Sequence, residues 1–444
     1  MIQHSTSTED TRRPGLGPKS TTSGAAPART RRIPRAADRI DVAVLDADQR
    51  QSLVCIRSLG RAGLRVGAFD AAYAAAFSSR WCTVSGLLPR GADASEAYVR
   101  QVLELVEQRA PKALLVASDE TVETLRARRT EIEQQTSLAL APNSAVDIAV
   151  DKDRTLALAE SLGVPVPRSV RVRDLADVHA AVREVGFPAV VKPVRSWLQD
   201  GGAGKRLGPL VVLNLDELRA AAAPSLAAGA SILVQQWIPG RREAIWLLYA
   251  DGRFWARFAQ VAYRMYPALG GSSVFRESIP VPVDSGDAAE KLVATIGLTG
   301  YSEVEFRRDV AGRPVLMEIN PRLSASLEVA VRAGVDFPRL IYLWATGDRL
   351  VEMTDYRYGV KVRWLGGDVR WLRESLANQG RPDIVRRRDA VGRFAADFFT
   401  RSFYDYVESR DIRPAVFASA AIAAHGARRG VARVRKGRGE QTRA

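Results

Sequence analysis

Residues 301–322 read YSEVEFRRDVAGRPVLMEINPR, which is two strand-like runs on either side of Ala311-Gly312. Two such runs joined by a short turn form a hairpin, and an even-length turn centred on Ala311-Gly312 fixes which residues lie opposite each other. In that register Glu305 faces Glu318. Two carboxylates in directly opposed positions repel each other, so the hairpin predicts that another group offsets their charge.

A divalent cation would offset this charge. The same register places Val310 opposite Arg313, and it puts Asn320 on the face of Glu318, because side chains alternate along a strand. Two carboxylates and an amide oxygen suit Mg²⁺ that is carried on phosphates. The alternative is a solvated sheet face on which nearby arginines balance the carboxylates. Those arginines would be Arg307, Arg308 and Arg313.

Lys192 closes an apolar strand in PAVVKP, residues 188–193, and a glycine-rich loop at residues 195–208 follows. Glycines let backbone N–H groups approach an anion, and lysines such as Lys192 and Lys205 can neutralise it. The loop lacks the GK[ST] helix start of a P-loop. Taken alone, the pattern also fits an ordinary, solvated strand end.

A third stretch, SILVQQWIPG at residues 231–240, is an apolar strand that runs into a Pro-Gly turn, with Glu243 shortly after. By itself it fits an ordinary strand exit. Around these stretches the patterns predict helices at 151–162, 174–185, 215–228, 287–297 and 324–346, and strands at 189–191, 210–213, 231–263 and around 303–318.

The preceding part of the chain alternates short apolar strands with helices. We expect strands at 42–45, 66–69 and 113–116, and helices at 50–62 and 95–108. Continuous apolar strands in alternation with helices indicate a parallel sheet covered on both faces.

Together these segments resemble the ATP-grasp superfamily. Within it, the chain is most similar to the predicted carboxylate–amine ligase group, through Ile56-Arg57-Ser58-Leu59-Gly60, Ser79-Arg80 and the loop 267–273. The segments that carry the wider resemblance are, in order, Asp151-Lys152, PAVVKP with Lys192, the glycine-rich loop, LVQQWIPG with Glu243, VEF with Glu305, and MEINPR with Glu318, Asn320 and Arg322.

The resemblance implies an α/β protein, α+β in its ATP-grasp part, in which a parallel-sheet pre-ATP-grasp domain precedes two lobes that clasp ATP. It does not extend to the two ends of the chain, for which composition and charge predict disordered basic tails. The expected parts are a tail at 1–40, the pre-ATP-grasp domain at 41–150, an ATP-grasp domain at 151–350 (small lobe 151–235, large lobe 236–350), an appendage at 351–409 and a basic tail at 410–444.

The resemblance also implies a role for individual residues in ATP and substrate binding. Lys192 and Arg322 would be the catalytic residues, with Arg322 beside the transferred phosphate or the substrate carboxylate. Lys152, Lys192 and Lys205 would contact phosphates, Gln235 the adenine amino group, Gln236, Trp237 and Ile238 the ring edge, Glu243 the ribose, Glu305, Glu318 and Asn320 the metal, and Arg264, Gly271 and Ser272 the acyl substrate.

The activity implied by the resemblance is ATP-dependent ligation, with Mg²⁺ or Mn²⁺. A carboxylate would become an acyl phosphate, which an amine then attacks to give an amide or peptide-like bond, ADP and phosphate. Two alternatives stay open: an ATP-grasp carboxylase that uses bicarbonate, and a non-catalytic ATP-binding scaffold. The residues leave the carboxylate and the amine unnamed.

The net charge of the 444-residue chain is +15, from 65 Lys+Arg and 50 Asp+Glu. The two tails carry most of it, since residues 1–40 account for +5 and residues 410–444 for +7, which leaves +3 between them. The charge therefore points to tails that could contact an anionic membrane or nucleic acid. The alternative is a short docked helix followed by a solvated tail.

Two cysteines and three histidines without metal spacing disfavour a zinc site and a Cys–His nucleophile pair. No apolar run approaches the length of a membrane-spanning helix, and no signal peptide is visible. We therefore expect a cytoplasmic enzyme with small-molecule substrates, and a homodimer is compatible with the family resemblance.

Overall fold

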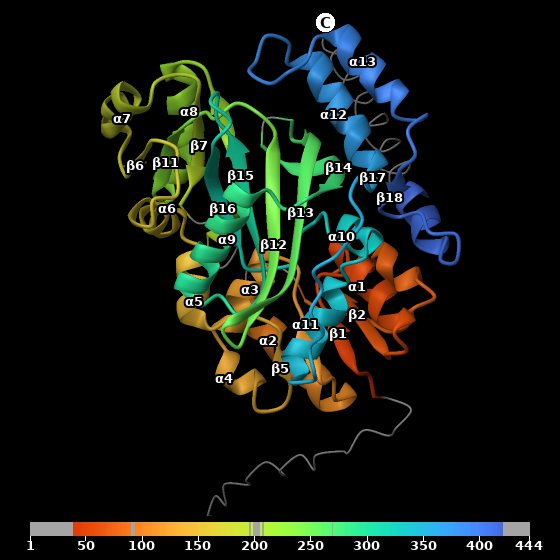
Figure 1. Cartoon of the computed structure of the whole chain (residues 1–444). Coiled ribbons are helices and arrows are strands. Elements are labelled where there is room, and N and C mark those ends of the chain that lie inside the picture. The colour runs from red at the N-terminus through yellow and green to blue at the C-terminus, as the bar shows by residue number, and fades with distance from the viewer. Residues whose placement is uncertain are drawn as a thin grey trace, which may run out of the picture. The chain divides into compact units, whose positions relative to one another are not determined.

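A computed structural model describes residues 39–89, 94–194, 197–198, 205–206, 208–268 and 270–420. The expected tails at 1–38 and 421–444 lie outside these ranges, as does most of the glycine-rich loop. Figure 1 shows the described elements, which form three main sheets. None of the helices in this part of the chain has the length and apolar character needed to cross a membrane.

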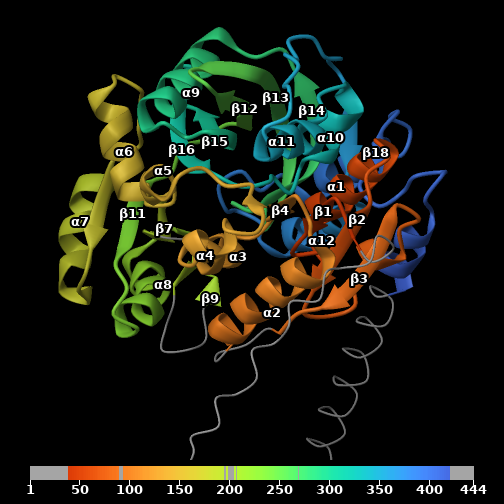
Figure 2. The same ribbon diagram turned by 90° about the horizontal axis from the view of Figure 1, so that it is seen from below.

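The N-terminal sheet is parallel and has the strand order β3-β2-β1-β4-β5, which confirms the expected α/β fold. Helices α1 and α11 cover one face, and α2 covers the other (Figure 2). The elements are β1 (Val42–Val44), α1 (Arg50–Arg61), β2 (Val66–Asp70), β3 (Cys82–Leu87), α2 (Ala94–Arg109), β4 (Ala113–Leu115), α3 (Asp119–Arg126), α4 (Arg129–Ile132), β5 (Ser137–Leu138), α5 (Asn143–Ala149) and α6 (Lys152–Ser161).

A small antiparallel sheet follows, in the order β10-β7-β11-β6. Two helices pack on one of its faces through a buried aliphatic cluster. The helix expected at 174–185 begins as a 3₁₀ turn and becomes α-helical only at Val178. The elements are β6 (Ser169–Val172), α7 (Val178–Val185), β7 (Ala189–Pro193), β8 (Trp197–Leu198), β9 (Lys205–Arg206), β10 (Leu210–Val212), α8 (Leu215–Ala227) and β11 (Ile232–Gln236).

The largest sheet has the order β16-β15-β12-β13-β14-β17-β18. Residues expected to form a separate appendage at 351–409 supply its last two strands, and the domain boundary at residue 350 stays a prediction. The elements are β12 (Arg242–Ala250), β13 (Arg253–Tyr266), β14 (Ser272–Ile279), α9 (Val283–Ile296), β15 (Gly300–Arg308), β16 (Pro314–Asn320), α10 (Glu328–Ala333), α11 (Phe337–Thr346), β17 (Lys361–Arg363), α12 (Leu365–Ala377), α13 (Arg387–Ala396) and β18 (Phe403–Tyr404).

The β15–β16 hairpin has a different turn from the one expected, yet it makes the expected carboxylate pair. Asp309 and Arg313 close a longer turn, with a 3.0 Å hydrogen bond from the Asp309 N–H to the Arg313 carbonyl. Val310 is 93% exposed at its tip and does not face Arg313. A bulge at Met317 then shifts the register by one residue. Glu305 is therefore paired with Glu318, as predicted.

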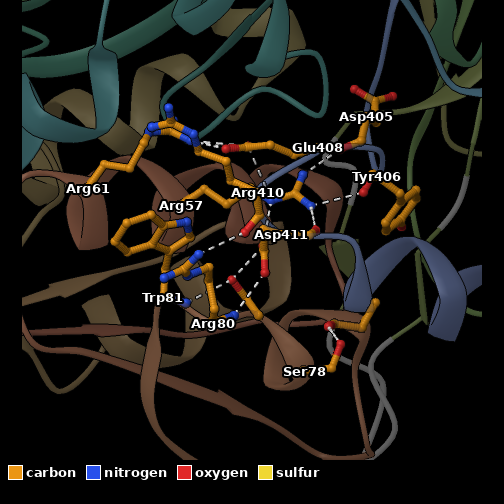
Figure 3. A network of polar contacts seen from close by, with 12 residues as sticks. Arg57, Arg61, Ser78, Arg80, Trp81, Asp405, Tyr406, Glu408, Arg410 and Asp411 are labelled. Carbon is orange, nitrogen blue, oxygen red and sulfur yellow. Dashed lines mark hydrogen bonds and ion pairs between the residues drawn. The ribbon is translucent and has the colours of Figure 1, made fainter.

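The two N-terminal motifs that carried the closer family resemblance hold the C-terminal segment. The fully buried Arg57 donates to the Asp411 carboxylate at 2.9 Å and to the Tyr406 and Asp411 carbonyls at 2.9 and 3.0 Å (Figure 3). Asp411 also accepts from the Ser79 hydroxyl at 2.7 Å and the Arg80 N–H at 2.8 Å. These contacts show that both motifs have a packing role.

This segment corrects the expected start of the basic tail. Asp411 is only 3% exposed, and residues 413–420 are helical. A few residues earlier, Asp405 lies between Arg50, at 2.7 Å, and Arg276. Residues 410–420 are thus part of the packed structure, because their carboxylate completes an ion-pair network with α1.

Replacing Arg57 with alanine should destabilise the protein strongly. The buried carboxylate of Asp411 and two carbonyls would lose their donors, at a cost of about 3–5 kcal/mol in the free energy of unfolding. Urea unfolding measures this loss. Arg61→Ala is the matched control on the same helix, because the half-exposed Arg61 pairs with Glu408 at the surface and should cost about 1 kcal/mol or less. Equal losses in the two variants would contradict the role of Arg57.

Candidate active site

A cavity of about 400 Å³ lies between the small sheet and the large sheet. Strands β7 and β11 supply one wall, and β12, β15 and β16 supply another. The loop from Met265 to Ser273 and the segment 322–326 complete the lining. Most of the predicted site residues converge on this space, although they come from five different strands and from α6.

Three carboxylates crowd one end of the large sheet. Glu305 and Glu318 are directly paired across β15 and β16, and Glu303 is paired with Asn320. The Asn320 amide lies 3.4 Å from both the Glu303 and the Glu318 carboxylates. The structure therefore brings together the three residues predicted to bind metal and adds a fourth.

Glu303 was missed by sequence reasoning. It is 3% exposed and accepts hydrogen bonds from the Trp246 indole at 3.0 Å and from the Ser324 hydroxyl at 2.7 Å. The available signal was its spacing, since Glu303 lies two residues before Glu305 and so shares the same sheet face. Its two neutral donors fix its orientation at the wall of the cavity.

Cations from three other elements balance these carboxylates. Lys152, at the start of α6, lies 3.6 Å from Glu318, and Arg242 on β12 lies 3.1 Å from Glu305. Lys192 on β7 is buried at the cavity wall. Arg242 was not singled out from the sequence, because nothing in a strand pattern shows which residue of a third strand will flank the hairpin.

The arginines expected to balance Glu305 and Glu318 form their direct hydrogen bonds and ion pairs with other groups, although Arg307 also lines the cavity. Arg307 donates to the Ile238 carbonyl at 2.7 Å and to Asp383 at 3.1 Å. Arg308 binds Glu243 at 2.8 Å, and Arg313 binds Asp309 at 2.9 Å. The solvated, arginine-balanced sheet face is therefore wrong for this hairpin.

The two paired carboxylates, Glu305 and Glu318, lie in different electrostatic environments, which shift their pKa values in opposite directions. Burial raises the pKa of Glu305 to about 8, with Glu303 and Glu318 adding to the effect against the charge of Arg242. Burial also opposes ionisation of Glu318, but Lys152, Lys192 and Arg322 outweigh it and hold its pKa well below the usual range. Glu305 thus lacks a full share of positive charge, which a bound cation would supply.

Burial lowers the pKa of Lys192 to about 8, although the nearby Glu318 carboxylate opposes this shift. A lysine in this setting gains by contact with an anion, because an additional negative charge favours its ammonium form. The Lys192 side chain lines the cavity together with Lys152. Both lysines are therefore placed to meet an anionic ligand.

The donor set fits Mg²⁺ that brings other ligands with it. Among the residues that the structure describes, no three Asp, Glu, His or Cys side chains are grouped as a self-sufficient metal site. Glu305, Glu318 and Asn320 offer oxygen atoms only, which are the ligands that Mg²⁺ takes when it is also bound to phosphates and water. These residues would hold a phosphate-bound Mg²⁺ ion.

The predicted adenine-binding segment runs along the end of β11. The buried Gln235 side chain donates to the Ser169 hydroxyl at 2.9 Å, and none of the described residues donates to its carbonyl oxygen. The Gln236 N–H donates to the Arg168 carbonyl at 2.8 Å, and the Ile238 carbonyl accepts from Arg307. The Arg307 guanidinium lies over the Trp237 ring, 4.4 Å from the centroid of that ring.

Arg322 projects into the cavity and is held from the N-terminal domain. Its guanidinium donates to both carboxylate oxygens of Asp119, the first residue of α3, and to the side-chain amide oxygen Oδ1 of Asn320 at 3.4 Å. Ser118 caps α3 and is held in turn by Asp46, which follows β1. Asp119 was not found from the sequence because it is about 200 residues away along the chain.

Two predicted residues lie outside the cavity. Arg264 forms a bidentate pair with Asp368 at 2.6 and 2.7 Å, contacts Asp397, and lies between the rings of Phe275 and Trp371. Glu243 is bound by Arg308 at 2.8 and 3.2 Å. Gly271 and Ser272 do line the cavity. The side chain of Lys205 and most of loop 195–208 are outside the described residues.

Comparison with known proteins agrees with this arrangement. Residues 276–367 match a family described as ATP-grasp in the biosynthetic pathway with Ter operon. A D-alanine–D-alanine ligase from Gloeobacter violaceus is 31% identical over 219 residues, covering 45% of this chain and 68% of that protein. A D-alanine–D-alanine ligase from Stutzerimonas stutzeri is 29% identical over 206 residues. The chain spans 63% of the length of that second relative.

Solved structures show the same fold at low sequence identity. The L-amino acid ligase from Bacillus licheniformis has a TM-score of 0.58 and 17% identity, over 72% of this chain and 79% of that chain. The biotin carboxylase from Campylobacter jejuni has a TM-score of 0.57 and 17% identity, over 73% of this chain and 75% of that chain. These likenesses support the overall architecture.

Replacing Arg264 with alanine should reduce stability and leave ATP binding intact. The buried Asp368 carboxylate would lose its bidentate partner, which we expect to cost about 3–5 kcal/mol in the free energy of unfolding. Urea unfolding measures the loss, and the shift of melting temperature on adding ATP and Mg²⁺ reports binding. Arg253→Ala is the control on the same strand, since its pair with Glu352 is exposed. A stable Arg264→Ala variant would return Arg264 to the substrate candidates.

Proposed function

Because the chain belongs to the ATP-grasp superfamily, we propose that it is an ATP- and Mg²⁺-dependent ligase that joins a carboxylate to an amine. The products would be an amide or peptide-like bond, ADP and phosphate. Since the chain spans less than two thirds of the first curated relatives, this activity rests on the site itself. We place the reaction in the cytoplasm, where ATP is available.

The observation that carries the proposal is the charge arrangement of the cavity. Two lysines and three arginines line the cavity with three carboxylates, and none of the described residues of its wall is a cysteine or a histidine. Such a site cannot form a thioester or a phosphohistidine, but it can neutralise a triphosphate and position a carboxylate beside it. Phosphoryl transfer to a carboxylate needs mainly this positioning and charge neutralisation.

Each charged residue of the cavity takes a defined part in the proposed reaction. Lys152 and Lys192 bind ATP phosphates, and the Gln235 carbonyl oxygen accepts from the adenine amino group. Glu305, Glu318 and Asn320 hold Mg²⁺, which would offset the charge on the phosphates. Arg322 binds the transferred phosphoryl group or the carboxylate. Gly271 and Ser272 border the acyl substrate.

The proposed reaction has two steps, phosphoryl transfer and then attack by the amine. A carboxylate oxygen attacks the γ-phosphorus, the bond to ADP breaks, and an acyl phosphate forms. The neutral amine then attacks the acyl carbon, loses a proton and displaces phosphate. Lys192 and Arg322 stabilise the negative charge that builds on the transferred group in the first step. Exclusion of water from the cavity protects the acyl phosphate from hydrolysis.

The alternatives differ in what the site must bind. A bicarbonate-using carboxylase has the same fold, as the biotin carboxylase neighbour shows, but the sequence has no biotin-carrier motif. A scaffold would bind ATP without turning it over, and its support is the basic character of the two ends of the chain. The intact set of Glu305, Glu318 and Asn320 favours catalysis over the scaffold.

The proposal is tested by phosphate release from ATP in the presence of pooled carboxylates and amines, with mass spectrometry of the products. We expect amine-dependent release and a product of combined mass. Release with bicarbonate alone would favour the carboxylase, and no release with any pool would favour the scaffold.

Within the same assay, Glu318→Ala should abolish Mg²⁺-dependent release while the protein stays folded. Glu290→Ala serves as the matched control, because Glu290 is equally exposed and lies on α9.

Asp119→Asn should lower kcat by about 10- to 100-fold, because Arg322 loses the carboxylate that orients it. The KM for ATP should change less than kcat, because Asp119 holds the Arg322 guanidinium and does not line the part of the cavity formed by Gln235 and Lys192. Steady-state kinetics separate the two effects. Glu123→Gln on the same helix is the control, because its partner is Arg126. An unchanged kcat would remove Asp119 from the positioning of Arg322.

A further inference from the structure

The outward surface of α13 and of the turn that follows it has no role in the proposed reaction. In Figure 1, α12 packs on β13 and β14, and α13 packs on the outer side of α12. Residues 386–403 contain five arginines, and all five are exposed. They are Arg386, Arg387, Arg388, Arg393 and Arg401.

The inner side of this segment is well anchored. Ala390 is fully buried, and Phe394 packs against the cluster that contains Trp371. The ring of Phe398 stacks edge-on against Phe394 at 5.4 Å, with the Arg363 guanidinium 4.3 Å from its centroid. Because these contacts fix the inner side, the opposite side of the helix is held outward.

The acidic residues of this segment do not cancel its arginines. Asp397 turns inward to the buried Arg264 and Asp389 pairs with Arg386 at 3.0 Å and Arg388 at 3.6 Å. Asp389 is thus the only carboxylate of residues 386–403 available to the outward side. The outward side therefore carries a clear excess of positive charge.

Large apolar side chains lie among these arginines. Phe399 is 94% exposed, and Val391, one helical turn from Arg387 and Arg388, is 49% exposed. A phenylalanine ring held almost entirely in water is unfavourable, and an apolar group with a charged rim marks an interaction surface. The partner must accept both guanidinium groups and inserted hydrocarbon.

We propose that the outward side of residues 386–403, with Phe399 at its tip, docks on an anionic lipid surface. Arginines attract acidic headgroups, while Phe399 and Val391 enter the boundary between headgroups and acyl chains. A second copy of the chain fits less well, because a symmetric contact would bring two sets of five arginines together. The phosphates of a nucleic acid would attract the arginines, but they would provide no apolar environment for Val391.

The contribution of one basic residue near an acidic membrane is modest, so several acting together with an inserted ring are needed for stable docking. This inference does not depend on the proposed ligase activity, and either can fail without the other.

The test is co-sedimentation of the full chain with vesicles of phosphatidylcholine mixed with phosphatidylglycerol, compared with phosphatidylcholine alone. We expect binding to the mixed vesicles only, weakened by added salt. Phe399→Ser should weaken the apparent affinity by about tenfold or more. Arg387→Glu combined with Arg388→Glu should weaken it at least as much.

Val283→Ser is the matched control, since Val283 is 77% exposed on α9, and it should bind as the unaltered chain does. Thermal melting verifies that each variant is folded. The proposal would be overturned if the Phe399 and arginine variants bound as tightly as the unaltered chain, or if the unaltered chain did not bind vesicles. It would also be overturned by a dimer that Phe399→Ser converts to a monomer, or by binding to single-stranded RNA, without vesicles, that the same variants abolish.

Discussion

The crowding of Glu303, Glu305 and Glu318 at one end of the large sheet is the constraint on which the site depends. Two buried carboxylates and a partly exposed one are unstable together unless cations flank them, because an unpaired buried charge costs several kcal/mol. Here Lys152 and Arg242 flank two of them, and Trp246 and Ser324 donate to the third. The resulting balance holds α6 and β12 against the hairpin and leaves Glu305 short of positive charge.

The same physical rule explains how the N-terminal domain is attached. Asp119 binds Arg322 at the cavity, and Arg57 binds Asp411 on the far side of α1. Arg50 and Arg276 share Asp405. Each pair joins residues that are far apart in the sequence, and each is shielded from water. Breaking one of these pairs would be costly, because it leaves a shielded charge without its partner.

The net charge of +15 is therefore a poor guide to the body of the protein. Many arginines of the folded part form ion pairs with internal carboxylates. Examples are Arg57, Arg264 and Arg363. The surface of α13 is different, since its arginines face outward beside Phe399 while Asp397 faces inward. The net charge indicates binding partners only after the arginines that pair with internal carboxylates have been set aside.

The sequence by itself determined most of the elements and the pairing of two carboxylates in the hairpin. Local patterns were sufficient for the parallel N-terminal sheet, for Lys192 at a strand end and for the pairing of Glu305 with Glu318. The pairing survived an incorrect turn only because Met317 adds a bulge, which compensates for the longer loop. Strand periodicity depends on neighbours along the chain, so it can be read without the fold.

Only the tertiary structure decided which charges meet. Arg264 and Glu243 carry groups suited to a substrate and a ribose, yet Asp368 and Arg308 occupy them. Glu303, Arg242 and Asp119 line or support the site but were not predicted from the sequence. Their partners lie on other strands or in another domain. Ion pairing depends on distances in space, and the sequence does not contain those distances until the chain is folded.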